Sequence, residues 1–337
     1  MRPARSKKRA SVVDVAKKAG VSQATVSRVF DPKWDGRIRP ETRKLVEEAA
    51  AALGYRGVNA LARSLQGEHS GIVALVVGPS TGYFYLEVIM KFVRRLREAG
   101  QQVLIFEVNP TKDLSAILSQ VQCYQVDGIV ITSAATSQII DSFSATDIPT
   151  VVFNRTVTTD TCSAVYCDGS AAGAAAADFL MEHGHRRFCV ITGNQNPSKE
   201  RHRLEGFCRR VEQLGGEILE IVDGDYRYES GYEAAAALLE HQRPDALFCL
   251  EDTIAMGAMD AARELYGLRV PEDLSVMGFD NTTVGRFHPY SLTTVAHPVA
   301  EMVDATVELL QNMIQDPTLR SSRTFATKIM VRRSVRL

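Results

Sequence analysis

Two side chains near the N-terminus carry the hydrogen-bonding groups that recognise the edges of DNA bases. Gln23 offers both donors and an acceptor, and Arg28 offers a fork of donors that matches O6 and N7 of guanine. Their neighbours Ala24, Thr25 and Ser27 are small. A major groove is about 12 Å wide, so a helix that enters it needs small or flexible residues on its leading face. The segment therefore has the composition of a DNA-reading helix.

The surrounding sequence predicts two short helices that would present these side chains. Ser11 and Asp14 form the Ser-x-x-acid pattern that opens a helix, and Gly20 ends it. Ser22 caps a second helix, whose inward-facing residues are Val26, Val29 and Phe30. Two short helices joined by a glycine turn are typical of a helix-turn-helix. On this pattern alone, an ordinary pair of helices with a merely solvated outer face remains the alternative.

A third helix is predicted to complete this small N-terminal domain. Pro40 suits a first helical turn, the apolar spacing continues over residues 41–53, and Gly54 ends the helix. The residues predicted to face inward are Leu45, Val46, Ala49, Ala50 and Leu53. Three helices in so short a segment make a small core, which would be marginally stable alone.

Charge is divided unevenly along the 337 residues, a length that suggests two or three domains. The first 70 residues contain 15 Lys and Arg against 7 Asp and Glu, which leaves 24 against 33 for the rest of the chain. A basic N-terminal part on an acidic body favours nucleic-acid binding through the N-terminal part alone.

The six cysteines form no Cys-x-x-Cys pair and lie beside no histidine cluster; they are Cys123, Cys162, Cys167, Cys189, Cys208 and Cys249. We expect free thiols in a reducing compartment, no metal site and no cofactor. The basic residues 2–9 are followed by no apolar segment, and no run approaches the roughly 18 apolar residues that a membrane span needs. A cytoplasmic protein is expected.

From residue 71 the pattern changes to short apolar runs alternating with amphipathic segments, which is typical of an α/β fold. The predicted strands are 72–77, 102–107, 128–132, 150–153, 188–192, 246–250 and 275–279. The predicted helices between them are 84–99, 171–182, 203–214 and 255–265. We predict an all-α head followed by two doubly wound parallel sheets.

Polar and aromatic residues follow the ends of these strands, where ligands of open parallel sheets bind. They are Tyr83, Phe84, Ser133, Asn154, Arg155, Arg203, Tyr226, Glu251, Asp252, Asp280 and Asn281. Carboxylates, amides, arginines and aromatic rings from two sheets favour a cleft for a small polar metabolite. Each residue taken alone could instead be a loop cap or part of a surface ion pair.

The chain resembles the lactose/galactose repressor family of bacterial transcription regulators over nearly its whole length. The resemblance is carried by the α/β body and by residues 14–22, 25–29, 41–43, 54–55 and 59–65. In that family the second helix reads the major groove in each half of a palindrome, and a linker folds on DNA into a hinge helix. Its leucine, matched here by Leu65, enters the minor groove and kinks the duplex. A plain flexible linker is the alternative for this segment.

The resemblance assigns roles by position. The base-reading residues would be Gln23, Ala24 and Arg28, and the residues that contact the DNA backbone would be Ser22, Thr25, Tyr55 and Asn59. Arg28 should contribute most to specificity because its guanidinium can bond two guanine atoms together. Ala24 can offer only a methyl contact.

Two departures from the family pattern affect the DNA-binding part. Gly57 and Val58 stand where members usually have a single proline before the hinge. Because glycine enlarges the freedom of an unfolded linker, ordering it should cost roughly 0.4–1 kcal/mol more. The loop of residues 31–39, which contains Trp34 and Arg37, is also longer than usual.

By the same resemblance the body is like a periplasmic binding protein, with two subdomains that close on an effector and three chain crossings, near Tyr166, Ala296 and Thr324. The implied organisation is a basic arm (1–10), a DNA-binding domain (11–56), a hinge (57–70) and an effector-binding domain (71–337). The last divides into an N-subdomain (71–166 plus 296–324) and a C-subdomain (167–295 plus 325–337).

The family's pocket positions fall on Asn154, Arg203, Tyr226, Glu251 and Asp280. Glu251 stands where a neutral residue is common, and an acid there suits hydroxyl or amine donors better than phosphate, so a sugar-like effector is expected. No leucine heptad follows residue 334, so we expect a homodimer, which would bind a palindromic site by two-fold symmetry.

Two other functions are alternatives to a DNA-binding regulator. Residues 78–82 match the G-x-S-x-G pattern of a hydrolase, but Pro79 precedes the serine and no histidine has a spacing suited to a catalytic base. Residues 169–173 lack the spacing of a dinucleotide-binding loop, and their glycines favour close helix packing. The second rival is a metabolite-binding protein without specific DNA recognition, which the basic head argues against. The sequence thus predicts a dimeric repressor and not an enzyme.

Overall fold

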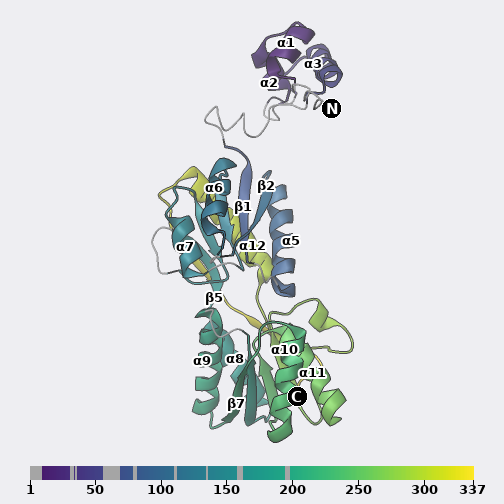
Figure 1. The fold of residues 1–337 in the computed structure, drawn as a ribbon, viewed down its shortest axis with the longest axis vertical. Coiled ribbons are helices and arrows are strands. Elements are labelled where there is room, and N and C mark those ends of the chain that lie inside the picture. The colour runs from purple at the N-terminus through teal and green to yellow at the C-terminus, as the bar shows by residue number, and fades with distance from the viewer. Residues whose placement is uncertain are drawn as a thin grey trace, which may run out of the picture. The chain divides into compact units, whose positions relative to one another are not determined.

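The computed structural model describes residues 10–30, 34, 36–55, 69–78, 82–109, 112–133, 136–157, 162–193 and 198–337 (Figure 1). The chain divides into two compact units, residues 1–71 and residues 72–337. The predicted hinge positions Gly57, Val58, Asn59 and Leu65 lie outside the described residues, as do the basic arm up to residue 9 and residues 79–81 of the G-x-S-x-G pattern. No helix among the described residues is both long enough and apolar enough to span a membrane.

The first unit contains the three predicted helices, α1 (Val12–Ala19), α2 (Gln23–Val29) and α3 (Pro40–Leu53). The predicted capping box opens α1: Ser11 Oγ accepts from the amide of Asp14, and the Asp14 carboxylate accepts from the amide of Ser11 at 2.9 Å. Gly20 follows with a φ of 67°, a left-handed conformation that costs glycine little. Ser22 then caps α2 by accepting from the amide of Thr25 at 3.1 Å.

The core of this unit lies where the three helices meet and consists of Val15, Ala16, Val26, Val29, Val46, Ala49 and Ala50. The prediction that Leu45 faces inward is wrong, because its exposed fraction is 53%. Adjacent helical positions point about 100° apart, and the stripe through Val46, Ala49 and Ala50 already faces the core. Phe30 is only partly buried and packs edge-on against Tyr55, with ring centroids 5.5 Å apart.

The second unit contains two sheets, as predicted, and each has six strands. The first sheet has the order β11-β5-β4-β3-β1-β2 and is parallel throughout. Its strands are β1 (Ile72–Val77), β2 (Gln102–Glu107), β3 (Gly128–Ile131), β4 (Thr150–Phe153), β5 (Ser163–Cys167) and β11 (Ser322–Phe325).

The second sheet has the order β12-β10-β9-β8-β6-β7 and is parallel except at one edge, where β12 runs antiparallel to β10. The prediction of a wholly parallel sheet is therefore wrong at that edge. Its strands are β6 (Arg187–Thr192), β7 (Glu217–Asp223), β8 (Ala246–Cys249), β9 (Ser275–Phe279), β10 (Thr293–Ala296) and β12 (Lys328–Met330).

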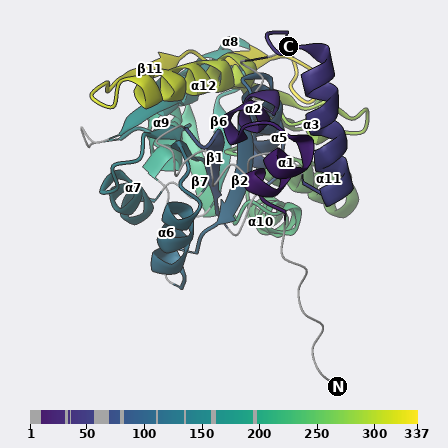
Figure 2. The same ribbon diagram turned by 90° about the horizontal axis from the view of Figure 1, so that it is seen from above.

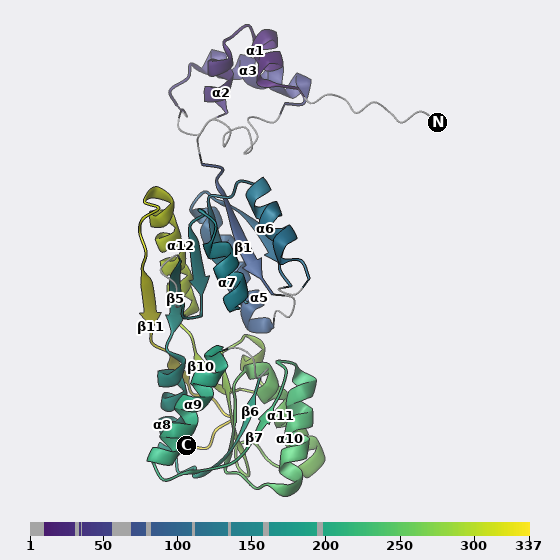
Figure 3. The same cartoon turned by 60° about the vertical axis from the view of Figure 1, so that its left-hand side comes forward.

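Helices cover both faces of the first sheet (Figure 3). One face packs against α5 (Tyr83–Glu98) and α12 (Val299–Gln315), and the other against α6 (Leu114–Cys123) and α7 (Ser137–Ser144). The side chains of β1 alternate between these two layers, which explains why its sequence is apolar at every position. At the edge, β11 lies beside α12 (Figure 2), and an Arg323–Glu308 ion pair of 2.8 Å joins them.

The second sheet is covered in the same way, by α8 (Gly169–Glu182) and α9 (Ser198–Gln213) on one face and by α10 (Tyr228–His241) and α11 (Asp252–Tyr266) on the other. A short 3-10 helix, η2 (Val284–Arg286), follows β9. The expectation that the glycines of residues 169–173 permit close helix packing is confirmed at Gly173. A Cβ atom there would lie 2.1 Å from the carbonyl oxygen of Arg203 on α9.

The chain passes between the two sheets three times: from β5 to α8, from β10 to α12 through His297 and Pro298, and from β11 to β12. The helices of the second sheet begin earlier than predicted. α8 begins at Gly169 and α11 at Asp252, because Asp168 and Glu251 cap them with their side chains. α9 begins at Ser198 rather than near residue 203.

Candidate functional sites

The DNA-reading side chains predicted on α2 are available at its surface. Gln23, Ala24 and Arg28 are exposed. The guanidinium carbon of Arg28 lies 4.7 Å from the centre of the Trp34 ring, a cation–π contact that holds this arginine in the DNA-free state. This contact could not be predicted from the sequence, because Trp34 belongs to the loop between α2 and α3.

Three of the predicted backbone-contacting residues, Ser22, Thr25 and Tyr55, are described, and each has a structural role in the head. The hydroxyls of Ser22 and Thr25 lie 2.9 Å apart at the start of α2. Tyr55 packs against Phe30, its hydroxyl is buried without a hydrogen-bond partner among the described residues, and burial raises its pKa. A phosphate would therefore reach the Tyr55 hydroxyl only after a local rearrangement.

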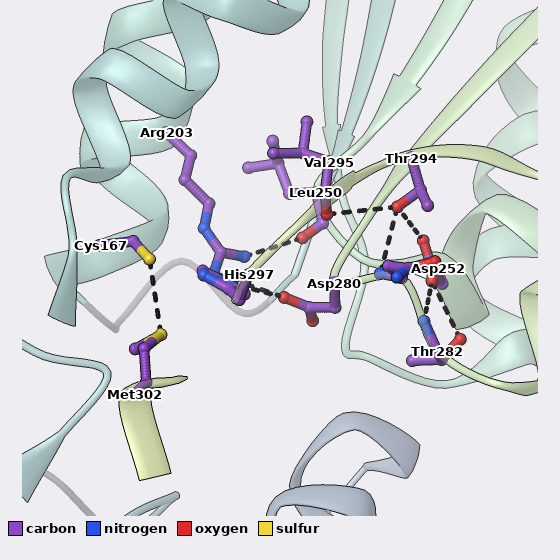
Figure 4. Close-up of polar contacts among 11 residues, drawn as sticks. Cys167, Arg203, Leu250, Asp252, Asp280, Thr282, Thr294, Val295, His297 and Met302 are labelled. Atoms are coloured by element: carbon purple, nitrogen blue, oxygen red, sulfur yellow. Dashed lines mark hydrogen bonds and ion pairs between the residues drawn. The ribbon is translucent and has the colours of Figure 1, made fainter. Parts of the chain in front are cut away.

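In the second unit, two predicted effector residues meet a histidine that was not predicted (Figure 4). Arg203 Nη2 lies 3.5 Å from Asp280 Oδ1 and 3.1 Å from His297 Nε2, and that imidazole nitrogen lies 3.3 Å from the same carboxylate oxygen. All three side chains are at least nine-tenths buried. They come from α9, from the end of β9 and from the crossing after β10. We call them the Arg203 cluster.

Aromatic rings enclose this cluster. The guanidinium carbon of Arg203 lies 3.7 Å from the centre of the Phe279 ring, and the His297 ring lies 5.4 Å from it. The ring of Phe84, on α5 of the first sheet, lies 5.3 Å from that of His297. Phe84, on a helix that covers the first sheet, thus packs against a cluster that contains residues of the second sheet and its helix α9. His297 could have been found by the strand-end rule that located Asp280, because it directly follows β10.

A buried carboxylate, Asp252, supports the loop that carries Asp280. Asp252 Oδ2 accepts from the amide and the hydroxyl of Thr282 at 2.6 and 2.9 Å, and Oδ1 accepts from the Thr294 hydroxyl at 2.6 Å (Figure 4). Burial raises the pKa of Asp252 from 3.8 to about 7. Asp280 and Asn281 have φ values of 103° and 58°, so two consecutive non-glycine residues adopt a left-handed backbone beside the cluster.

Glu251 is occupied locally. Its Oε2 accepts from the amides of Thr253 and Ile254 at 2.6 and 3.2 Å, and its Oε1 accepts from the Thr253 hydroxyl at 2.9 Å. Burial and the nearby Asp280 and Asp252 raise its pKa well above the usual value. The Glu251 carboxylate therefore caps α11. A capping role of this kind is the alternative that the sequence analysis gave for each polar residue at a strand end.

The other predicted effector residues lie at the ends of their own elements. Ser133 Oγ accepts from the amide of Gly78 at 3.0 Å and ties the ends of β3 and β1 together. Asn154 has a φ of 57°, and its buried side-chain nitrogen has no hydrogen-bond partner among the described residues. Arg155 and Tyr226 are half-buried, and Tyr83 is half-exposed on α5.

The Arg203 cluster is suited to bind a small polar molecule. It presents a guanidinium donor, a carboxylate acceptor and an imidazole between flat apolar rings. In the part of the chain that the structure describes, no group of three or more His, Cys, Asp or Glu side chains is placed to hold a metal ion. All six cysteines are free thiols, and burial raises the pKa of Cys167 to about 12 and of Cys189 to about 11.

Comparison with known proteins gives a consistent answer for both units. Residues 11–57 match the model for bacterial regulatory proteins of the lacI family, and residues 177–335 match a periplasmic binding protein-like domain. The HTH-type transcriptional regulator DegA of Bacillus subtilis (strain 168) is 34% identical over 302 residues, 87% of this chain and 88% of that protein. Catabolite control protein A of Priestia megaterium is 31% identical over 320 residues, 93% of this chain and 95% of that protein.

Solved structures are similar over the same extent. The complex of the transcriptional regulator CelR with cellobiose has a TM-score of 0.71 at 28% identity and covers 97% of this chain and 100% of that one. The lac repressor dimer bound to operator and the anti-inducer ONPF has a TM-score of 0.86 at 23% identity, covers 98% and 100%, and shows the shared fold.

A helix-turn-helix head followed by a two-sheet sensor body defines a ligand-responsive, DNA-binding transcription regulator. The chain belongs to the lacI family of bacterial regulatory proteins. The predicted resemblance and fold class are confirmed, and the relatives are transcription regulators rather than enzymes.

Proposed function

We propose that this protein is a repressor that binds a palindromic operator as a homodimer and responds to a small, sugar-like effector held at the Arg203 cluster. The observation that carries this proposal is the meeting of Arg203 and Asp280, beside the second sheet, with His297 from the crossing after β10 and Phe84 from α5 beside the first sheet. A regulator that binds the bacterial chromosome would act in the cytoplasm.

The chemistry of the cluster supports a hydroxylated ligand. Asp280 can accept hydrogen bonds from hydroxyl groups, Arg203 can donate to their oxygens, and the rings of Phe279 and Phe84 suit the apolar faces of a sugar. The similar CelR structure contains cellobiose, and another similar family member contains ribose. Calorimetric titration with a panel of mono- and disaccharides tests this. One sugar should bind, and Asp280→Asn should weaken that binding; a panel without a binder would contradict the sugar-like class.

A hydrogen bond between the subdomains supplies a route from the effector to the rest of the molecule. The amide of Thr283 donates to Glu87 Oε1 on α5 at 2.7 Å. Thr283 follows the loop that begins at Asp280, so a ligand that moves Asp280 also acts on this contact. An effector can shift the arrangement only by its different affinity for the two states. Glu87→Gln, which weakens this bond, should alter the effect of the ligand on operator affinity.

The exposed face of α5 supports a homodimer. Tyr83, Leu86 and Met90 recur at helical spacing on this face, and each is about half exposed (50%, 49% and 51%). Contiguous large apolar side chains at a surface favour a protein interface. We expect Leu86→Glu with Met90→Glu to shift the protein toward monomer in sedimentation equilibrium. Leu265→Glu on α11, where the leucine is 52% exposed, is the matched control and should leave the dimer intact; equal behaviour of both variants would exclude α5 as the interface.

The DNA specificity rests on α2 and is tested by selection from random duplexes at about physiological salt. The full-length protein should recover an inverted repeat, and Arg28→Ala should lose the preference at one symmetric base pair at a cost of about 1–3 kcal/mol. Lys44→Ala, which removes an exposed positive charge from α3, should weaken binding without changing the selected sequence. Recovery of bulk DNA alone would favour the rival function, a metabolite-binding protein without specific DNA recognition.

A further inference from the structure

A second candidate binding site lies in the C-subdomain. A cavity of about 650 Å³ is lined by residues of α11, of the loops 270–272 and 288–291, and of the C-terminal segment 332–337. Its volume is within the range of sites for small molecules. The wall contains four arginines, Arg263, Arg332, Arg333 and Arg336, together with His288.

These arginines are poorly neutralised. Arg263 lies 3.5 Å from Asp260, whereas none of the other three forms an ion pair with a carboxylate of the described residues. The guanidinium of Arg332 instead donates to two neutral oxygens, the carbonyl of Leu292 and the side chain of Asn281. Burial and the positive Arg286 lower the pKa of Arg332, and the nearby Asp252 offsets this only in part. Positive charge thus converges in one cavity of a body that is otherwise acidic.

Only one side-chain carboxylate, Glu272, is found among the described residues that line this cavity. Guanidinium groups that line a common space repel one another, and an anion bound between them removes that repulsion. The planar fork of arginine binds phosphate and carboxylate groups through two parallel hydrogen bonds. A cavity of this volume has room for a metabolite rather than a single ion.

We propose that this cavity binds a small phosphorylated metabolite with at least two negative charges, as a second ligand site separate from the Arg203 cluster. Arg333 and Arg336 are exposed and provide the first contacts, and the half-buried Arg332 provides the innermost one. The proposal goes beyond the repressor function, and its binding step does not depend on that function.

The site is connected to the effector loop through Arg332. The guanidinium of Arg332 donates to the side-chain oxygen of Asn281, and the backbone carbonyl of Asn281 accepts from Arg286 Nη2 at 3.1 Å. Asn281 directly follows Asp280 of the Arg203 cluster. An anion that draws Arg332 toward the cavity weakens its bond to Asn281, so occupation of the cavity changes the stability of the loop that carries Asp280.

Calorimetry of the full-length protein with inorganic pyrophosphate at constant ionic strength tests the binding step. We expect saturable binding of one pyrophosphate per chain and a loss of about tenfold or more in the Arg333→Ala, Arg336→Ala double variant. The matched control is the Arg187→Ala, Arg209→Ala double variant, which removes two exposed arginines from the same subdomain and should bind as the wild type does. Citrate and a penta-glutamate peptide are titrated in parallel.

Hydrogen–deuterium exchange with and without saturating pyrophosphate tests the connection, and residues 279–283 should change their exchange rates. Absence of saturable pyrophosphate binding, or equal loss in the two double variants, overturns the site. Tighter binding of citrate overturns the choice of phosphate, and binding of the peptide alone overturns the choice of a small ligand. Unchanged exchange at residues 279–283 overturns the connection. None of these readouts requires the operator or the effector of the proposed repressor.

Discussion

The replacement Gly173→Ala tests how the Arg203 cluster is positioned. The added Cβ atom would lie 2.1 Å from the carbonyl oxygen of Arg203 and 2.8 Å from the amide of Phe207. Both are backbone atoms, so no side-chain rotation relieves the clash, and α8 and α9 must separate by about 1 Å to restore ordinary contact. Alanine is intrinsically better in a helix than glycine by about 1 kcal/mol, whereas overpacking costs typically 1–3 kcal/mol.

We expect the cost of the clash to exceed the gain in helix propensity, because both distances are far shorter than van der Waals contact and both partners are backbone atoms. Gly173→Ala should lower the free energy of unfolding by about 1–2 kcal/mol in urea titrations. Because α9 carries Arg203, effector affinity should fall as well. Gly206→Ala places its Cβ atom 2.2 Å from the carbonyl of Ser170 across the same helix pair and should behave alike. Ala171→Gly, at an exposed position of α8, measures the effect of the difference in helix propensity between alanine and glycine without a clash. A Gly173→Ala protein as stable as the wild type would refute the reasoning.

Three further predictions concern pH, DNA and the linker. Asp252 keeps its proton in the folded state up to about pH 7 but loses it near pH 4 in the unfolded state. The free energy of unfolding that Asp252 contributes therefore falls as the pH rises between these values, by about 2 kcal/mol from pH 5 to pH 7. Asp252→Asn should therefore lose most stability relative to wild type near pH 5, and urea unfolding at both pH values should show the gap narrowing; a constant gap would contradict it. Operator binding should change the emission of Trp34, the one tryptophan of the chain, because Arg28 must leave its ring to reach a base; unchanged emission at saturating operator would show that Arg28 stays on Trp34. Replacing Gly57 and Val58 by a single proline should tighten operator binding in fluorescence anisotropy, by up to about fivefold, because proline restricts the unfolded linker; equal or weaker binding would count against a linker that costs more to order.

The helices of the head and most of the buried strands could be predicted, because local patterns determine them. The capping box at Ser11, the glycine turn at Gly20 and the apolar runs of β1 and β9 each carry their own signal. The edge strands β7, β11 and β12 were not predicted, because polar residues interrupt their apolar pattern, whereas the edge strand β2 keeps an apolar run from Val103 to Phe106. The inner strands β5 and β10 were also missed, because they are short and rich in Ser, Thr and Ala. Leu45 was wrongly predicted to face inward, because an apolar run alone does not show which of two adjacent residues faces the core.

The strand-end rule selected Arg203 and Asp280, which the structure brings into contact, but it could not tell a carboxylate of this cluster from a carboxylate that caps a helix. Glu251 and Asp280 both follow strands, and only the structure shows that Glu251 is occupied by the amides of α11. The same rule reaches His297 only once β10 is recognised as a strand, and the short sequence of β10 carries no clear strand pattern. Contacts such as Arg28 with Trp34, or Arg332 with Asn281, join distant segments and have no local sequence signal.

The loop that begins at Asp280 has the properties of a switch. Two consecutive left-handed, non-glycine residues cost about 1–3 kcal/mol each, and such a backbone persists only where its surroundings hold it. Three hydrogen bonds stabilise it here. Asp252 accepts from the amide of Thr282, and Arg332 donates to the side chain of Asn281. Glu87, on α5 beside the first sheet, accepts from the amide of Thr283. The strain is comparable to the 1–3 kcal/mol by which allosteric sites are usually coupled. A ligand at the Arg203 cluster and an anion at the arginine-lined cavity would therefore act on the same strained segment, and their effects on each other's affinity should be equal, as linkage requires.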